Sequence, residues 1–200
     1  DLPGIMLGSA AQRLIRLYGI KPGNRAVVAT ANQDGYGVAL DLLDAGMEVA
    51  CVVDVRPDPP EEEMSAAVMR RHVPILAGAT LREAVPSAGG LGVRAVKIAR
   101  LESATKAARR YDSFACDVIA MSGSYVPAAA MLHQAGGRVS FAADNGSFSV
   151  HDLPAHLSAA GSVGGTNALE NVLSEGAAAG RAAASDAGVS SAGASAAPSI

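Results

Sequence analysis

The chain has 200 residues, of which 50% are hydrophobic and 18% are charged, enough for a hydrophobic core in one or two domains. A net charge of −3, an aromatic content of 4% and the lack of tryptophan offer nucleic acid neither a basic face nor a stacking platform. No apolar run approaches the roughly 18 residues of a membrane span. Cys51 and Cys116 lie in predicted strands without C-x-x-C spacing, which favours two inert thiols in the reducing cytoplasm.

The first 20 residues predict an amphipathic helix, because apolar side chains recur at helical spacing after a Pro-Gly turn. These side chains are Met6, Ala10, Leu14 and Leu17. Residues 21–24 read Lys-Pro-Gly-Asn, a turn at which we expect the chain to cross between domains.

Residues 25–54 read as one strand, turn, helix and strand. The first strand covers 25–30 and ends in a turn that contains Asn32, Asp34 and Gly35. An apolar helix follows over 38–45, and a second buried strand over 49–53 stops at Asp54. This order is typical of half a nucleotide-binding fold, so we predict an α/β protein.

The turn of this unit suggests a pyrophosphate site, because backbone N–H groups and a helix N-terminus converge there. Asp54 follows Gly35 by 19 positions, close to the interval of about 20 residues expected for an acid that binds the adenosine ribose. Thr30 and Asn32 stand where the first two glycines of G-x-G-x-x-G belong, and only Gly35 matches. A unit that packs but binds nothing is the alternative, with Asp34 an ordinary helix-start acid and Asp54 facing water.

The choice of dinucleotide depends on two neighbouring charges. Arg56 could favour a 2′-phosphate, but the Asp54 carboxylate would repel one. The sequence therefore favours NAD over NADP.

The middle of the chain predicts a helix from Glu61 to His72 and then short strands over 73–76, 81–85 and 93–101. We interpret these strands as a meander inserted after the strand–helix–strand unit. The charged stretch 102–111 is ambiguous. A buried strand over 116–121 follows and ends at a Ser-Gly-Ser turn.

A second predicted site lies near the C-terminus. A strand over 156–160 leads to the glycines of 161–165, and Thr166 or Asn167 caps a helix over 168–184. This loop could hold something anionic or polar, or its glycines could only permit close packing. We interpret all four histidines as structural or surface residues, and we identify neither a metal site nor a catalytic acid, base or nucleophile. From residue 185 on, small residues predict a flexible linker.

Three motifs occur in order along residues 1–184: DLPGIMLGSA, the strand–helix–strand unit, and CDVIAMSGSYVP followed by HLSAAGSVGGTNALENVLSEGAAAG. Together they resemble the flavoproteins with two dinucleotide-binding domains, in particular the alpha subunit of heterotetrameric sarcosine oxidase and related amine or opine oxidases. The resemblance rests on the joint order of the motifs.

The resemblance implies a Rossmann-like NAD-type domain over 22–114, inserted in an incomplete FAD-type three-layer domain formed by 1–21 and 115–184, with a linker over 185–200. The first FAD fingerprint would precede Asp1, so we expect a piece of a longer protein. The implied cofactors are NAD and FAD, and the implied partners are other oxidase subunits and a small secondary amine such as sarcosine. Amine oxidation in that family belongs to a flavin site largely on another subunit.

The resemblance also adds site residues. Ser122 and Gly123 match the strand that crosses back into the flavin-type domain, and Gly161, Ser162 and Gly164 match a late A-G-D motif with Ser162 in place of the aspartate. The complete predicted cofactor-binding set is Thr30, Asn32, Asp34, Gly35, Asp54, Ser122, Gly123, Gly161, Ser162, Gly164 and Thr166. The alternative is a non-catalytic Rossmann-like scaffold or subunit-interaction module with vestigial sites, which the departures at Thr30, Asn32 and Ser162 favour.

Overall fold

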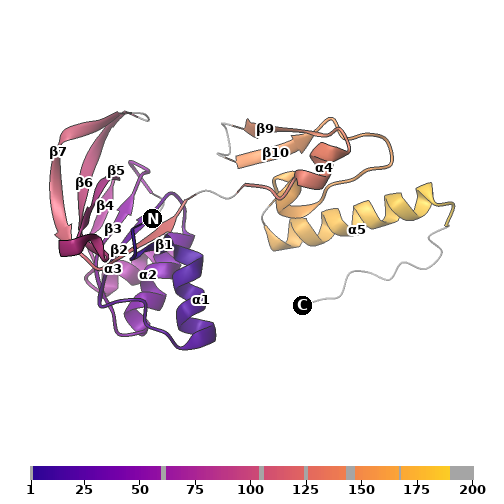
Figure 1. Cartoon of the computed structure of the whole chain (residues 1–200). Coiled ribbons are helices and arrows are strands. Elements are labelled where there is room, and N and C mark those ends of the chain that lie inside the picture. The colour runs from indigo at the N-terminus through magenta and orange to yellow at the C-terminus, as the bar shows by residue number, and fades with distance from the viewer. Residues whose placement is uncertain are drawn as a thin grey trace. The chain divides into compact units, whose positions relative to one another are not determined.

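The computed structural model describes residues 2–59, 62–103, 106–123, 126–142, 147–166 and 168–189. The chain divides into two compact units, Asp1–Ser124 and Tyr125–Ile200 (Figure 1). Within the described ranges, no helix combines the length and the apolar character that crossing a bilayer requires.

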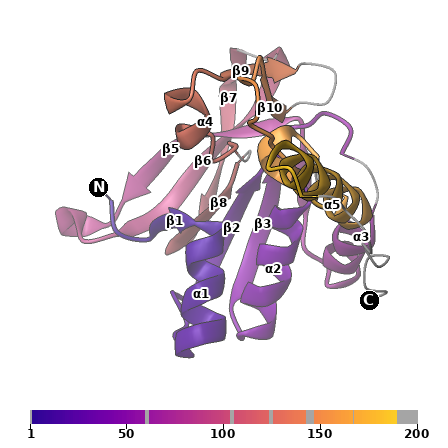
Figure 2. The same cartoon turned by 90° about the vertical axis from the view of Figure 1, so that its right-hand side faces the viewer.

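A five-stranded parallel sheet forms the centre of the first unit, with the strand order β1-β8-β2-β3-β4. Figure 2 shows β2 and β3 side by side, with α1 and α2 beside them. The elements are β1 (Ile5–Leu7), α1 (Gly8–Tyr18), β2 (Arg25–Thr30), α2 (Asp34–Asp44), β3 (Glu48–Asp54), α3 (Glu63–Arg70), β4 (Ile75–Ala77) and β8 (Val118–Ser122).

A three-stranded antiparallel meander covers the other face of this sheet. Its strands are β5 (Ala79–Pro86), β6 (Val93–Ser103) and β7 (Lys106–Ala115), and the short 3-10 turn η1 (Ala88–Gly90) joins the first two. Successive side chains of β2 point to opposite faces of the sheet. Val28 packs with the helices, whereas Val27 packs with the meander. The unit is therefore a three-layer α/β structure, and the predicted fold class is confirmed.

The strand order places the centre of the sheet at β2. The chain runs outward from β2 to β3 and β4, and then returns through the meander to β8 on the opposite side of β2. In open α/β sheets, ligands bind beyond the carboxyl ends of the strands where the order reverses in this way. The boundary between β2 and β8 is that point.

The second unit is the smaller of the two. It contains α4 (Ala130–Gln134), the antiparallel pair β9 (Arg138–Ala142) and β10 (Ser147–His151), the 3-10 turn η2 (Gly161–Gly164) and α5 (Leu169–Asp186). No residue of α5 is buried within the chain.

Several sequence predictions need correction. Met6, predicted in the first helix, lies in strand β1, and Thr166 does not cap α5, whose N-cap is Ala168 without a side-chain cap hydrogen bond. The strand predicted over 156–160 does not form, because His156 has a left-handed φ of 67°, which ends any extended run. Segment 75–77 joins the parallel sheet, and the third meander strand is β7, most of which lies in the stretch left ambiguous. Helix α5 continues to Asp186, so the first two residues of the predicted linker are helical, whereas residues 190–200 lie outside the described ranges.

The predicted domain assignment remains a prediction. The proposed crossings lie near residues 21 and 114, but β1 and β8 from outside these limits pair in the same sheet as β2. In the sequence, the two compact units divide after residue 124.

Candidate functional site

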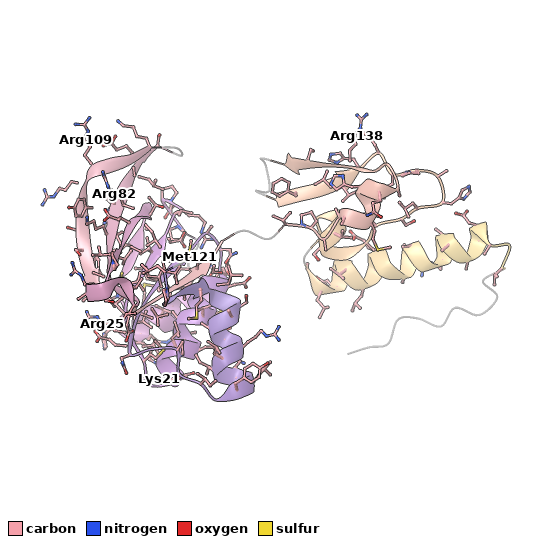
Figure 3. All side chains as sticks on the ribbon, viewed as in Figure 1. Lys21, Arg25, Arg82, Arg109, Met121 and Arg138 are labelled. Carbon is pink, nitrogen blue, oxygen red and sulfur yellow. The ribbon has the colours of Figure 1, made fainter. Side chains whose placement is uncertain are left out.

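The predicted residues of the first unit converge at the carboxyl edge of the parallel sheet. Thr30, the last residue of β2, is in register with Asp54 at the end of β3 and with Ser122 at the end of β8. In Figure 3, Met121 marks this edge and Arg25 marks the opposite, amino end. Residues from three strands and from the turn before α2 therefore meet in one place.

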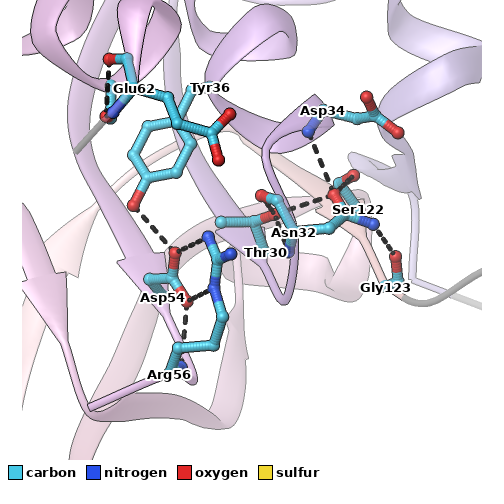
Figure 4. Close-up of polar contacts among 10 residues, drawn as sticks. Thr30, Asn32, Asp34, Tyr36, Asp54, Arg56, Glu62, Ser122 and Gly123 are labelled. Carbon is cyan, nitrogen blue, oxygen red and sulfur yellow. Dashed lines mark hydrogen bonds and ion pairs between the residues drawn. The ribbon is translucent and has the colours of Figure 1, made fainter. Parts of the chain in front are cut away.

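The turn before α2 is held together by its own side chains (Figure 4). The hydroxyl of Thr30 donates to the carbonyl of Asn32 (2.7 Å) and accepts from the N–H of Asn32 (3.1 Å). The side-chain oxygen of Asn32 accepts from the N–H of Asp34 (3.1 Å) and from the hydroxyl of Ser122 (3.2 Å), and its amide donates to the carbonyl of Gly123. Two of the N–H groups that a phosphate would use are thus satisfied internally.

Gly35 allows the close approach of α2 to β2. A Cβ atom at this position would lie 2.3 Å from both Cβ and Oγ1 of Thr30, far inside van der Waals contact. The third glycine of the fingerprint is needed here because the first position carries a side chain. Gly35 therefore has a packing role, and Thr30 fills the space that a glycine would leave open.

Asp54 lies beneath this loop, in a cluster that the sequence did not predict. Its side chain is fully buried, and its two oxygens accept four hydrogen bonds, from the Tyr36 hydroxyl and from three nitrogen atoms of Arg56. Burial by itself would raise the pKa of the Asp54 carboxyl, but the hydrogen bonds from Arg56 and Tyr36 outweigh it and hold that pKa below its ordinary value. Burial and the Asp54 carboxylate raise the pKa of the Tyr36 hydroxyl. Asp54 is thus a charged, fully hydrogen-bonded group and does not face water.

A cavity of about 190 Å³ opens next to the loop. Its lining includes the predicted residues Thr30, Ser122 and Gly123 together with mostly apolar neighbours: Ala29, Ala31, Val53, Val55, Thr80, Leu81 and Met121. Val53 packs with the meander, and Ala29 lies two positions after Val27 on the same face of β2. Thr80 and Leu81 belong to β5, so the cavity lies on the meander side of the edge. It is large enough for a single ring, and its walls suit an apolar one.

The second predicted site belongs to the other unit. The N–H of Gly161 donates to the Glu175 carboxylate (3.0 Å), and the Thr166 hydroxyl donates to the other oxygen of the same carboxylate. These bonds from Thr166 and Gly161 lower the pKa of Glu175. Ser162 and Gly164 lie on η2 in the same loop. Glu175 thus takes up two of the loop's donors, as Asn32 takes up a donor at the first site.

The sequence did not single out Tyr36 or Glu175, and it considered Arg56 only as a partner of a 2′-phosphate. Tyr36 follows the fingerprint glycine directly, and Arg56 lies two residues beyond the strand-end acid. An aromatic hydroxyl and a guanidinium so close in sequence to a buried acid are its natural partners. Glu175 gave no such signal, because its partners precede it by nine and fourteen residues.

Neither metal ligands nor reactive thiols gather in the described part of the chain. No group of three or more His, Cys, Asp or Glu side chains is arranged there to hold a metal ion. Burial, and to a lesser extent the Cys116 thiol, raises the pKa of Cys51 to about 12. Burial, and to a lesser extent the Asp117 carboxylate, raises the pKa of Cys116 to about 11. Both cysteines are free and buried. Because their thiols stay protonated at neutral pH, they are weak nucleophiles.

The chain is similar to three curated proteins named sarcosine oxidase subunit alpha. It is 30% identical to the one from Rhizobium meliloti (strain 1021) over 180 residues, which cover 89% of this chain and 16% of the relative. The identity with the protein from Corynebacterium sp. (strain U-96) is 31% over 181 residues, covering 89% of this chain and 18% of the relative. The chain thus spans about one sixth of the length of these relatives. No protein-family model matches it.

Solved structures with the same fold include a reductase and a dehydrogenase. Thioredoxin reductase from T. acidophilum superposes with a TM-score of 0.61 at 15% identity, over 92% of this chain and 58% of that one. L-proline dehydrogenase from P. horikoshii has the same TM-score at 16% identity, over 95% of this chain and 31% of that one. At these identities the likeness establishes the fold alone.

Proposed function

Because the chain matches a segment of sarcosine oxidase alpha subunits along most of its length, as its motifs predicted, we propose that it is the dinucleotide-binding part of a flavin-dependent oxidoreductase subunit. The whole protein would oxidise sarcosine or a similar secondary amine together with other subunits, in the cytoplasm. The first unit would hold NAD, and the second would contribute to an FAD-type domain through Gly161, Ser162, Gly164 and Thr166.

The strongest support for an NAD site in the first unit is the register of three strand ends. The ends of β2, β3 and β8 are in register at Thr30, Asp54 and Ser122, at the point where the strand order reverses. The close approach of α2 at Gly35 brings a helix N-terminus to the same edge, which suits a pyrophosphate. The adjoining cavity has room for one ring of the dinucleotide.

The chain's own residues would bind and orient the cofactor. When bound, NAD or FAD supplies the hydride chemistry. The backbone N–H of Asp34 would donate to a pyrophosphate oxygen after Asn32 turns its side-chain oxygen away, and Thr30 and Ser122 would line the entry to the apolar cavity. The reaction centre would lie elsewhere in the protein.

The second candidate is a scaffold or subunit-interaction module that keeps the fold with its sites closed. The specific observation in its favour is that Asn32 and Glu175 already occupy donors in the two loops, and that Asp54 has no acceptor site to spare.

Thermal unfolding with added ligand separates the two functions. NAD at a hundred times its Kd would add about 2.7 kcal/mol to the free energy of unfolding and raise Tm by about 5–10 °C. AMP is a suitable control, because it lacks the pyrophosphate bridge. A Tm that neither NAD nor FAD moves would leave the scaffold as the function.

A further inference from the structure

The strand-end acid of this fold is positioned to hold an arginine. Asp54 Oδ1 accepts from the backbone N–H of Arg56 (2.9 Å) and from its Nε (3.0 Å), while Oδ2 accepts from its Nη2 (2.7 Å) and from the Tyr36 hydroxyl (2.8 Å). A carboxylate has about four lone-pair positions, so Asp54 is saturated. A ribose hydroxyl that donated to Asp54 would have to displace one of these partners from a fully buried position.

Arg56 is the accessible member of the pair. The side chain of Arg56 keeps 27% of its surface exposed, whereas that of Asp54 keeps none. Nε and one N–H of Nη2 are used on Asp54, and the guanidinium also interacts with the Tyr36 hydroxyl. The two N–H groups of Nη1 remain. Figure 4 shows the remaining guanidinium nitrogen turned away from Asp54. The bidentate contact fixes the plane of the guanidinium, so these free donors have a set direction.

We propose that Arg56, rather than Asp54, contacts the adenosine ribose of the dinucleotide, and that Asp54 with Tyr36 positions Arg56. The proposal rests on the proposed function of the first unit as a dinucleotide site. The outward N–H groups of Arg56 donate to the ribose hydroxyl oxygens, which reverses the direction of the hydrogen bond expected from a strand-end acid.

The charge of the pair would favour NAD over NADP. Asp54 and Arg56 together are neutral, so the pair does not disfavour the binding of an uncharged ribose diol. A 2′-phosphate gains little attraction from Arg56, because the Asp54 carboxylate already compensates the charge of Arg56. Removal of the Asp54 charge would leave Arg56 as an uncompensated cation at the same place.

Calorimetric titration of the full chain with NAD and NADP tests the proposal. In Arg56→Met the affinity for NAD is expected to fall about tenfold, as for the loss of a hydrogen bond from a charged donor, and Arg56→Lys restores little of it because an ammonium lacks the planar fork. In Asp54→Asn the ratio of NADP to NAD affinity is expected to rise about tenfold. A merely structural role for Asp54 would lower both affinities and leave their ratio unchanged.

Arg71→Met is the matched control, because Arg71 is an exposed arginine in an ion pair with Asp44. Direct binding of ribose by Asp54 would instead leave NAD affinity level or increased in Arg56→Met, although the ratio would also rise in Asp54→Asn. An NAD affinity that Arg56→Met does not lower overturns the proposal. Lack of NAD binding by the unaltered chain is a different outcome, since it rejects the proposed function on which the inference rests.

Discussion

The hydroxyl of Tyr36 donates to Oδ2 of Asp54 over 2.8 Å, and both side chains are fully buried. This bond ties the first turn of α2 to the last residue of β3, directly beneath the loop of the candidate site. Tyr36 reaches Asp54 because Gly35, one residue earlier, lets α2 approach β2 so closely. The close packing that Gly35 allows therefore also determines the environment of the Asp54 carboxylate.

Removal of the Tyr36 hydroxyl should destabilise the first unit. In Tyr36→Phe the ring still fills its place, but a buried carboxylate loses one of its four donors, which costs about 1–3 kcal/mol. Urea unfolding followed by circular dichroism measures this change. Tyr18→Phe is the control, because Tyr18 is 63% exposed and should change stability by less than about 0.5 kcal/mol. Equal effects of the two substitutions would mean that the Tyr36–Asp54 bond adds nothing to stability.

The pH dependence of stability should reflect the lowered pKa of Asp54. Since the folded-state pKa lies below the ordinary value of 3.8, the stabilisation is complete above the unfolded-state pKa and is lost as the pH falls through the folded one. The free energy of unfolding of the unaltered chain should thus decrease from about pH 4 downward. In Asp54→Asn this decrease should be shallower, with a remainder from Asp117, whose pKa is also lowered. Parallel curves for the two proteins would contradict the assignment.

The contact between Gly35 and Thr30 predicts a strong coupling between these positions. Gly35→Ala should cost about 1–3 kcal/mol, because the new Cβ overlaps the Thr30 side chain. Thr30→Gly removes the overlapping atoms, so the double variant should recover most of that loss, which a double-mutant cycle in urea measures. Gly176→Ala is the control, since nothing lies within 4 Å of its Cβ position inside α5. Additive effects of the two substitutions would show that α2 shifts freely away from β2.

The layered fold was predictable because it depends on local patterns. Apolar runs of four to six residues, broken by turns that contain glycine, identify β2, β3 and β8. Strand β7 escaped detection because it carries Arg109, Arg110 and Asp112 and is largely exposed, so its pairing with β6 decides its structure more than its composition does.

The chemistry of the site was less predictable than the fold, because it depends on which side chains meet. A carboxylate at the end of β3 fits a ribose partner in sequence, but its burial and its four donors follow from the packing of Tyr36 and the folding back of Arg56. The turn residues Thr30 and Asn32 were identified as departures from the glycine pattern. Their mutual hydrogen bonds appear only once the loop has its shape.

Because the Asn32 side chain caps the N–H of Asp34, we expect a trade-off between stability and affinity for NAD at this position. Asn32→Gly removes the oxygen that accepts from the N–H of Asp34 and should cost about 1 kcal/mol of stability, as the loss of a helix cap does. The same change frees that N–H for a pyrophosphate oxygen, so the affinity for NAD should rise a few-fold in calorimetric titration. A fall in affinity would instead mean that the Asn32 side chain itself binds the dinucleotide, as the sequence alone suggests.

In the second unit, Glu175 should control the order of the glycine loop. Its carboxylate accepts from the N–H of Gly161 and from the hydroxyl of Thr166, so Glu175→Ala should speed amide hydrogen exchange at Gly161 while α5 remains helical. In the unaltered chain the protection should be complete above the ordinary pKa of 4.5 and should disappear as the pH falls through the lowered folded-state value. Glu170→Ala, which removes an exposed acid from the first turn of the same helix, should leave exchange at Gly161 unchanged. If both variants accelerated exchange at Gly161 equally, the cause would be the charge of α5 as a whole, and the specific bonds of Glu175 would not hold the loop.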